Sequence, residues 1–124
     1  MKVRDLMIRQ VVTIKRDTTI EKACKILYER HVGSVVITDE EKKCKGIFTE
    51  RDAIRTVATN IPLNTDLREV MTKNVMTIWE GASFAEAKQL YRTHGIRHLP
   101  VVEEKDHLVG MLSIRSVLDD LIEL

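Results

Sequence analysis

The sequence has few of the residues that cross-link or interrupt a fold. It holds two cysteines (Cys24 and Cys44), two prolines and five glycines in 124 residues. Two cysteines make neither a disulfide framework nor a zinc-binding pattern. The four histidines also lack zinc-ligand spacing to them, so we expect no structural metal. Sequence patterns for a P-loop, a GxGxxG turn, a nucleophile elbow or paired carboxylates are missing as well, which disfavours the common enzyme classes.

An excess of one charge is also missing. Lys and Arg number 20 and Asp and Glu number 19, so the net charge is +1. Electrostatic capture of nucleic acid needs a basic excess, and we expect no nucleic-acid partner. No apolar run approaches the roughly 18 residues of a membrane-spanning helix. The first fifteen residues carry charges throughout, without the apolar core of a secretory signal. We therefore expect a cytoplasmic protein with no membrane contact.

The sequence repeats itself. When it is shifted by 64 positions, residues 5–55 align with residues 69–119 without a gap. Eight of these 51 positions are identical: Met7/Met71, Val11/Val75, Thr13/Thr77, Ile14/Ile78, Ala23/Ala87, Glu40/Glu104, Gly46/Gly110 and Arg51/Arg115. The ungapped register and the shared hydrophobic pattern indicate duplication.

Each copy predicts the same order of elements, β-α-β-β-α. The predicted strands are 11–14, 34–38 and 44–49 in the first copy, and 75–78, 98–102 and 108–113 in the second. Capping-box spacing predicts helix starts at Thr18 with Glu21 and at Ser83 with Glu86, and closing helices begin near Glu50 and Ile114. Residues 57–68 form the join. We expect an α/β (α+β) fold whose repeats, 1–60 and 61–124, pack sheet to sheet with pseudo-twofold symmetry and leave a ligand cleft between them.

Three motifs carry a resemblance to a known family. Residues 46–52, GIFTERD, fit the pattern G-h-x-[TS]-x-x-[DN], where h is apolar, and residues 110–116, GMLSIRS, fit it except at the last position. Residues 96–102, IRHLPVV, are close to the apolar-R-H-L-P-V-V strand of the same family. The chain thus resembles a tandem pair of CBS (cystathionine β-synthase) domains, or Bateman module, over nearly its whole length. The resemblance implies a stand-alone regulatory module that binds AMP, ADP, ATP or S-adenosylmethionine and modulates a partner protein.

The residue types at the first motif suit such a ligand. A helix that starts after Thr49 offers N–H groups and a positive dipole end to a phosphate, and the threonine adds a hydroxyl donor. An ionised Asp52 is an acceptor only, so it can take both hydroxyl protons of a ribose. The family's geometry adds the opening segment of the second repeat. The implied contacts are Gly33, Ser34, Ile47, Thr49, Arg51, Asp52, Met71, Thr72, Lys73, Asn74, Val75, Met76, Arg97 and His98.

The second motif departs from the family pattern, because Ser116 stands where the acidic residue belongs. A serine has a single uncharged hydroxyl, so it cannot hold both hydroxyls of a diol as a charged, two-oxygen carboxylate does. We expect a weaker, empty or differently occupied pocket there. Its implied contacts are Met7, Ile8, Arg9, Gln10, Val11, Val12, Met111, Ser113, Arg115 and Ser116.

Simpler interpretations stay open at these positions. The Thr49–Asp52 spacing is also that of an ordinary helix cap, and Arg97 and His98 also suit a solvated strand end. Two other functions compete with the regulatory module. One is a ligand-free structural interaction or dimerisation module. The other is a small nucleotide-acting enzyme with Asp52 or His98 as acid–base, which is disfavoured because no second catalytic group stands beside either.

Apolar residues in the closing helices predict an oligomer. The helices near 50–59 and 114–124 carry more apolar residues than one small core needs, such as Val117, Leu118, Leu121 and Ile122. We expect a homodimer that packs through these helices.

Overall fold

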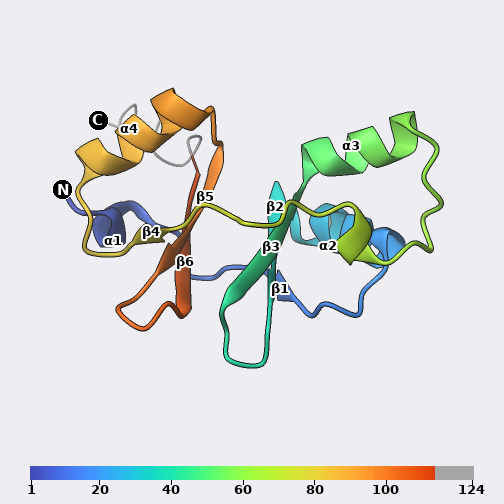
Figure 1. The fold of residues 1–124 in the computed structure, drawn as a ribbon, viewed down its shortest axis with the longest axis horizontal. Helices are drawn as coiled ribbons and strands as arrows, with labels where there is room; N and C mark the ends of the chain where they lie inside the picture. The colour runs from blue at the N-terminus through green and yellow to red at the C-terminus, as the bar shows by residue number, and fades with distance from the viewer. Residues whose placement is uncertain (114–124) are drawn as a thin grey trace. The chain divides into compact units, whose positions relative to one another are not determined.

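The computed structural model describes residues 1–113, and the chain divides into two compact units (Figure 1). One unit is Val12–Val75, and the other combines Met1–Val11 with the chain from Met76 onward. The predicted closing helix near Ile114 lies outside the described residues. Within residues 1–113, no helix is both long and apolar enough to cross a membrane.

The unit Val12–Val75 has the predicted β-α-β-β-α order. Its elements are β1 (Thr13–Ile14), α2 (Ile20–Arg30), β2 (Ser34–Thr38), β3 (Cys44–Thr49), α3 (Glu50–Ala58) and the 3-10 turn η1 (Leu67–Glu69). Strand β1 runs parallel to β2, and β2 runs antiparallel to β3. The sheet order β1-β2-β3 therefore follows the chain order.

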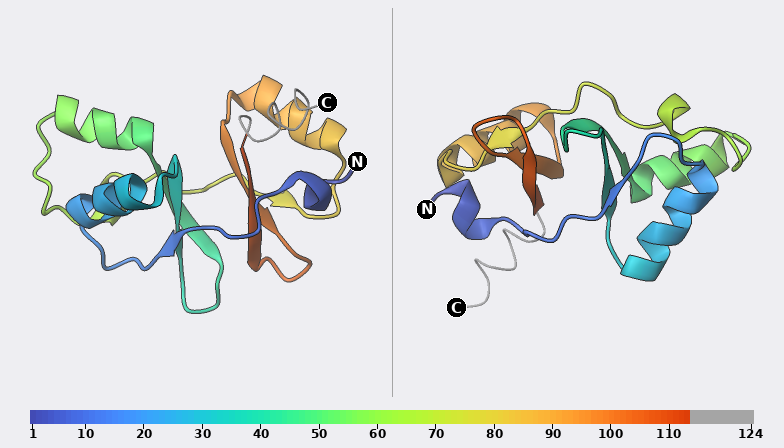
Figure 2. Two further views of the ribbon diagram at one scale, coloured as in Figure 1. Left: turned by 180° about the vertical axis from the view of Figure 1, so that it is seen from behind. Right: turned by 90° about the horizontal axis from the view of Figure 1, so that it is seen from below.

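One face of this sheet carries the core of the unit. Helices α2 and α3 lie on the same side of the sheet (Figure 2). The buried side chains are Ile20, Ala23 and Leu27 of α2, Val35 and Ile37 of β2, Phe48 of β3, and Leu67 of η1. The alternation of β2 and the i, i+3, i+7 spacing of α2 direct these residues to one layer.

The start of α2 differs from the prediction by one residue. Thr19 is the N-cap, and its side chain accepts a hydrogen bond from the Lys22 amide at 3.2 Å. Thr18 instead donates its hydroxyl to the Lys15 carbonyl at 2.8 Å. The capping box predicted for Thr18 was therefore wrong, because either of two adjacent threonines can cap a helix and only the backbone path selects one.

The other unit repeats this architecture. Its elements are α1 (Val3–Leu6), β4 (Ile78–Trp79), α4 (Phe84–His94), β5 (His98–Val102) and β6 (Leu108–Ser113), with sheet order β4-β5-β6. Ser83 caps α4 as predicted, accepting from the Glu86 amide at 3.1 Å. Tyr91 takes the place of Leu27 and donates its buried hydroxyl to the Leu112 carbonyl at 3.0 Å. Burial raises the pKa of this phenol.

Each compact unit takes its opening segment from the other repeat of the sequence. Val3 is fully buried in the cluster that α4, β5 and β6 form, and its amide donates to the Ala82 carbonyl at 2.9 Å. Leu67 is likewise buried against α2, and its amide donates to the Thr18 carbonyl at 2.8 Å. The compact units therefore differ from the sequence repeats by the exchange of these two segments.

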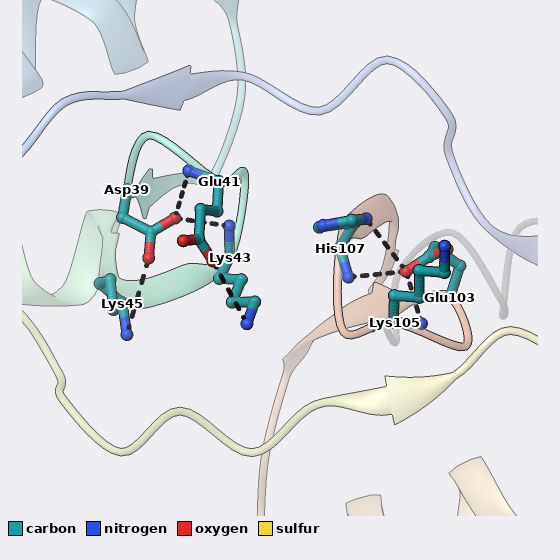
Figure 3. Close-up of polar contacts among 7 residues, drawn as sticks. All are labelled: Asp39, Glu41, Lys43, Lys45, Glu103, Lys105 and His107. Atoms are coloured by element: carbon teal, nitrogen blue, oxygen red, sulfur yellow. Dashed lines mark hydrogen bonds and ion pairs between the residues drawn. The ribbon is translucent and has the colours of Figure 1, made fainter.

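One carboxylate closes each hairpin turn (Figure 3). Between β2 and β3, Asp39 accepts from the amides of Glu41 at 2.9 Å and Lys43 at 3.0 Å. Between β5 and β6, Glu103 accepts from the amides of Lys105 at 2.7 Å and His107 at 2.9 Å. These bonds satisfy turn amides that the sheet ladders leave unpaired.

Candidate functional site

The junction of β3 and α3 brings the two motif residues together. The apolar run of β3 ends at Thr49, whose hydroxyl accepts from the Asp52 amide at 3.3 Å. In return, Asp52 Oδ2 accepts from the Thr49 amide at 2.9 Å and from its hydroxyl at 3.1 Å. This is a reciprocal capping box. The Thr49 hydroxyl proton is directed at Asp52, so donation to a phosphate requires that it turn away.

The carboxylate of Asp52 is buried and paired. The residue is only 5% exposed. Its second oxygen, Oδ1, pairs with Arg55 Nη2 at 3.0 Å. A buried carboxylate needs such partners, because an uncompensated charge is costly to remove from water. Both carboxylate oxygens therefore have donors from within the unit.

Arg55 was not among the predicted site residues. Its Nη2 atom also donates to the Val70 carbonyl at 3.1 Å, so one guanidinium nitrogen joins α3 to the segment that follows η1. The i, i+3 spacing of Asp52 and Arg55 on a helix is the signal that could have found this ion pair.

The segment Met71–Val75, which we call the strap, begins along the free edge of β3. Thr72 and Ile47 form an antiparallel bridge, with N–H···O distances of 3.0 and 3.1 Å. Met71 lies over Gly46, where an added Cβ would come within 2.5 Å of the methionine sulfur. The absence of a side chain at Gly46 permits this close approach.

The start of β2 completes the junction. Ser34 stands opposite Thr49 in the sheet register, and the Gly33 carbonyl accepts from the Glu50 amide at 3.0 Å. The first amides of α3 were expected to be free for a phosphate. The amides of Glu50 and Asp52 instead have partners within the unit, which corrects that expectation in part.

The structure therefore gathers seven of the predicted contacts along β3 and at its junction with α3: Gly33, Ser34, Ile47, Thr49, Asp52, Met71 and Thr72. Arg51, Lys73 and Asn74 are exposed in the same unit, and Val75 is half-buried. Asn74 has a left-handed backbone with φ of 53°. Met76, Arg97 and His98 belong to the other unit.

The second predicted site shows the matching arrangement as far as the described residues reach. Ile8 bridges Met111 with N–H···O distances of 2.8 and 2.9 Å, and Met7 lies over Gly110. Ser113 stands opposite His98 in the register of β5 and β6. Arg9, Gln10 and Val11 follow Ile8 in the same unit, whereas Val12 belongs to the other. Arg115 and Ser116 lie outside the described residues.

Two open grooves lie mainly along helices, and one of them reaches the junction at Glu50. One, of about 500 Å³, is lined by Ile78, Ala85, Glu86, Gln89 and Leu90. The other, of about 300 Å³, is lined by Cys24, Leu27, Tyr28, Glu50, Ala53 and Ile54. The predicted ligand contacts line neither groove. We place the candidate site at the junction because the predicted polar groups converge there beside apolar side chains, the combination that is typical of small-molecule sites.

Comparison with known proteins identifies close relatives in sequence. The family model of the CBS domain matches residues 3–59 and again residues 67–123. The chain is 34% identical over 113 residues to the CBS domain-containing protein YhcV of Bacillus subtilis, covering 90% of this chain and 79% of that protein. It is 33% identical over 113 residues to inosine-5′-monophosphate dehydrogenase of Aquifex aeolicus. That match covers 90% of this chain and 23% of the enzyme.

Solved structures agree with the sequence comparison. The CBS domain protein PAE2072 from Pyrobaculum aerophilum, complexed with AMP, superimposes with a TM-score of 0.89 at 27% identity, over 100% of both chains. The CBS domain pair of protein MJ0100, in complex with 5′-methylthioadenosine and S-adenosyl-L-methionine, gives a TM-score of 0.89 at 26% identity, over 98% of this chain and 95% of that one. With two matched segments, the same two three-stranded sheets and this structural likeness, the chain belongs to the CBS-domain family and carries two CBS domains in tandem.

Proposed function

We propose that this chain is a regulatory module that binds an adenosyl ligand at the β3–α3 junction of the unit Val12–Val75. The observation that carries the proposal is the convergence of a buried carboxylate, a capping hydroxyl and the strap within one unit. Support comes from the ligands of the two structural neighbours. AMP, 5′-methylthioadenosine and S-adenosylmethionine all contain an adenine base and a ribose with two free hydroxyls.

The ribose and the adenine of such a ligand each have a counterpart at the junction. Asp52 is the acceptor for the ribose hydroxyls, since an ionised carboxylate only accepts hydrogen bonds. Backbone groups of the strap suit the edge of adenine, and Met71 and Ile47 offer apolar contact to its faces. Arg97 and His98, with Arg51 and Lys73, remain proposed contacts for a phosphate or another charged group. Met76 remains a proposed contact for the adenine.

Regulation is the second half of the proposal. The match to inosine-5′-monophosphate dehydrogenase covers 23% of that enzyme, so in that relative the similar segment accompanies a larger catalytic protein. A ligand modulates a partner by binding one conformation more tightly than another. We propose that the adenosyl ligand shifts this chain between two such states, and that a partner protein recognises one of them.

We also propose that the chain acts as a homodimer through the predicted closing helices. Helix α3 exposes Ile54 and Val57, which are 69% and 68% exposed, and Tyr28 of α2, which is 80% exposed, lines a groove together with Ile54. The groove of about 300 Å³ lies between these helices. Contiguous exposed apolar side chains are typical of a protein–protein interface. The other half of the proposed interface, 114–124, lies outside the described residues.

Thermal unfolding with a ligand panel tests the binding proposal. Wild-type protein is measured alone and with AMP, ADP, ATP, S-adenosylmethionine and GTP. A ligand at a hundred times its Kd adds about 2.7 kcal/mol, which raises the Tm of a chain of this size by on the order of 10 °C. We expect at least one adenosyl ligand to do so, and GTP not to. No shift with any adenosyl ligand contradicts the proposal.

Asp52→Asn locates the site in the same experiment. Asparagine keeps the shape and one acceptor oxygen but loses the charge and the second acceptor. We expect the affinity for the adenosyl ligand to fall by roughly tenfold or more, in keeping with hydrogen bonds to a charged group. Asp66→Asn is the matched control, because Asp66 is a capping carboxylate of the same unit whose donors come from Arg68 and not from Thr49 or Arg55. Equal ligand shifts in wild type and Asp52→Asn would contradict the assignment.

A ligand-free interaction module is the second candidate. It is favoured by one observation: both oxygens of Asp52 have donors from within the unit. On that account Asp52→Asn lowers the Tm without changing any response to nucleotides.

A further inference from the structure

The hydrogen bonds at Asp52 leave too little room for a ribose. A carboxylate offers about four acceptor positions, two on each oxygen. The amide and hydroxyl of Thr49 use both positions on Oδ2. Arg55 uses one position on Oδ1. One position is left, whereas two ribose hydroxyls need two.

Of the three donors, Arg55 is the one that a ligand can displace. The bond from the Thr49 amide belongs to the capping box, and its loss would uncap α3. The Thr49 hydroxyl oxygen is held beside Oδ2 by the Asp52 amide, so turning its proton away still leaves an oxygen against that position. The Arg55 side chain is 55% exposed, whereas that of Asp52 is 8% exposed. A released guanidinium is therefore hydrated at once, and ion pairs with such an exposed partner are weak.

The same nitrogen of Arg55 ties Val70, the residue before the strap, to the helix. Nη2 lies 3.0 Å from Asp52 Oδ1 and 3.1 Å from the Val70 carbonyl oxygen. Val70 directly precedes Met71, where the strap begins. A guanidinium that leaves Asp52 cannot keep both contacts in their present geometry. Events at the carboxylate are thus linked to the start of the strap.

We propose that Arg55 is a positioning residue that holds the ligand-free state: it occupies Asp52 Oδ1 in place of a ribose hydroxyl and is displaced when a diol-containing ligand binds. This inference rests on the proposed function. It adds that Arg55 competes with the ribose for Asp52, and that this competition is linked to the start of the strap. Displacement of Arg55 releases Val70, so ligand occupancy loosens the contact between α3 and the residue that leads into the strap. The ribose diol, rather than the base or the phosphate, drives this exchange.

Binding of an uncharged diol probe tests the competition. The probe is 5′-methylthioadenosine, which has no phosphate, so removing the positive charge of Arg55 cannot act through a phosphate. Its 2′-deoxy analogue, which lacks one hydroxyl of the diol, is the comparison. We expect Arg55→Ala to tighten 5′-methylthioadenosine binding about two- to fivefold in calorimetric titration, the range of a weak ion pair. The 2′-deoxy analogue should gain less. Arg55→Lys should lie between wild type and Arg55→Ala, and Arg30→Ala, an exposed charge at the end of α2, should bind as wild type does.

A merely structural role predicts the opposite sign. If Arg55 only holds Asp52 in place for the ligand, Arg55→Ala weakens binding of the diol probe. Weaker or unchanged binding overturns the proposal, as does an equal gain for the 2′-deoxy analogue.

Hydrogen exchange of the ligand-free protein separates this inference from the proposed function. Arg55→Ala should speed amide exchange at Met71 and Thr72 at least several-fold relative to Arg30→Ala, because the Val70 contact is lost. Unchanged exchange overturns the link to the strap. If exchange speeds up but wild type binds no adenosyl compound, the proposed function and the competition fail, while the tether between Arg55 and the strap stands.

Discussion

Asp39 and Glu103 hold equivalent positions in the two hairpins, and each closes its turn with one carboxylate. The Lys43 amide, with that of Glu41 and the nearby lysines, holds the pKa of Asp39 below its usual value. The His107 amide, with that of Lys105 and the His107 and Lys105 charges, lowers the pKa of Glu103 in the same way. Each carboxyl is thus bonded most strongly in its charged form, which makes both turns sensitive to acid.

This charge dependence predicts how stability changes with pH. A lowered pKa in the folded state means that the unfolded chain binds protons first as the pH falls. The stabilisation is therefore complete above the unfolded pKa values, about 3.9 for Asp and 4.3 for Glu, and is lost as the pH falls through the lower folded values. Denaturant unfolding between pH 5.5 and about 3 should show a shallower loss of stability in the double variant Asp39→Asn, Glu103→Gln than in wild type. Parallel pH profiles would contradict this account.

At the scale of elements, each opening segment is fastened to a strand by the same device. A methionine lies over a glycine at the centre of the strand, and the next residue bridges the strand's edge. The two methionines, Met7 and Met71, are one identical pair of the repeat, and the two glycines, Gly46 and Gly110, are another. The glycines are required by this close approach, because a methyl group would stand 2.5 Å from the sulfur in either unit.

The two glycines should tolerate alanine unequally. At Gly110 the added methyl meets Met7, which is only 8% exposed, and the Ile8 carbonyl at 3.0 Å, a backbone atom that cannot turn aside. At Gly46 the three nearest atoms all belong to the side chain of Met71, which is half-buried and can move outward. We expect Gly110→Ala to cost about 1–3 kcal/mol by overpacking, and Gly46→Ala to cost less. Denaturant unfolding measures both, and a larger cost at Gly46 would contradict the explanation.

The elements were predictable where local chemistry decides them. Strands β2, β3, β5 and β6 have the bounds that apolar runs between polar turns predict. Helix α1, Val3–Leu6, was not predicted, because four residues are too few to show a helical period. The junction of Thr49 with Asp52 follows from capping chemistry, but the Arg55 contact to Val70 joins residues fifteen apart and depends on tertiary placement. The partners of individual carboxylate oxygens leave no trace in a sequence pattern.

At the scale of the whole molecule, the exchange of opening segments makes the two repeats interdependent. Neither repeat has a complete core alone, since the fully buried Val3 and Leu67 each pack with the body of the other repeat. A chain cut between the repeats should therefore lose buried apolar contacts in both units.

The molar mass of the protein in solution tests the proposed homodimer. Light scattering at tens of micromolar should give twice the 14.3 kDa of one chain. Ile54→Asp places a charge on the exposed face of α3 and should shift the protein toward monomer, because an interface charge without a partner is costly. Leu63→Asp, at an exposed apolar residue outside both helices, is the control and should leave the mass unchanged. A wild-type mass of one chain would contradict the dimer.

The central claim, that an adenosyl ligand binds at the β3–α3 junction, is tested most directly by mapping the backbone amides of labelled protein as AMP or S-adenosylmethionine is added. The account predicts that amide resonances of 33–34, 49–52 and 71–75 shift together, with one Kd, and that those of 85–90, along the larger groove, stay in place. Shifts centred on 85–90, or none with either ligand, would contradict it.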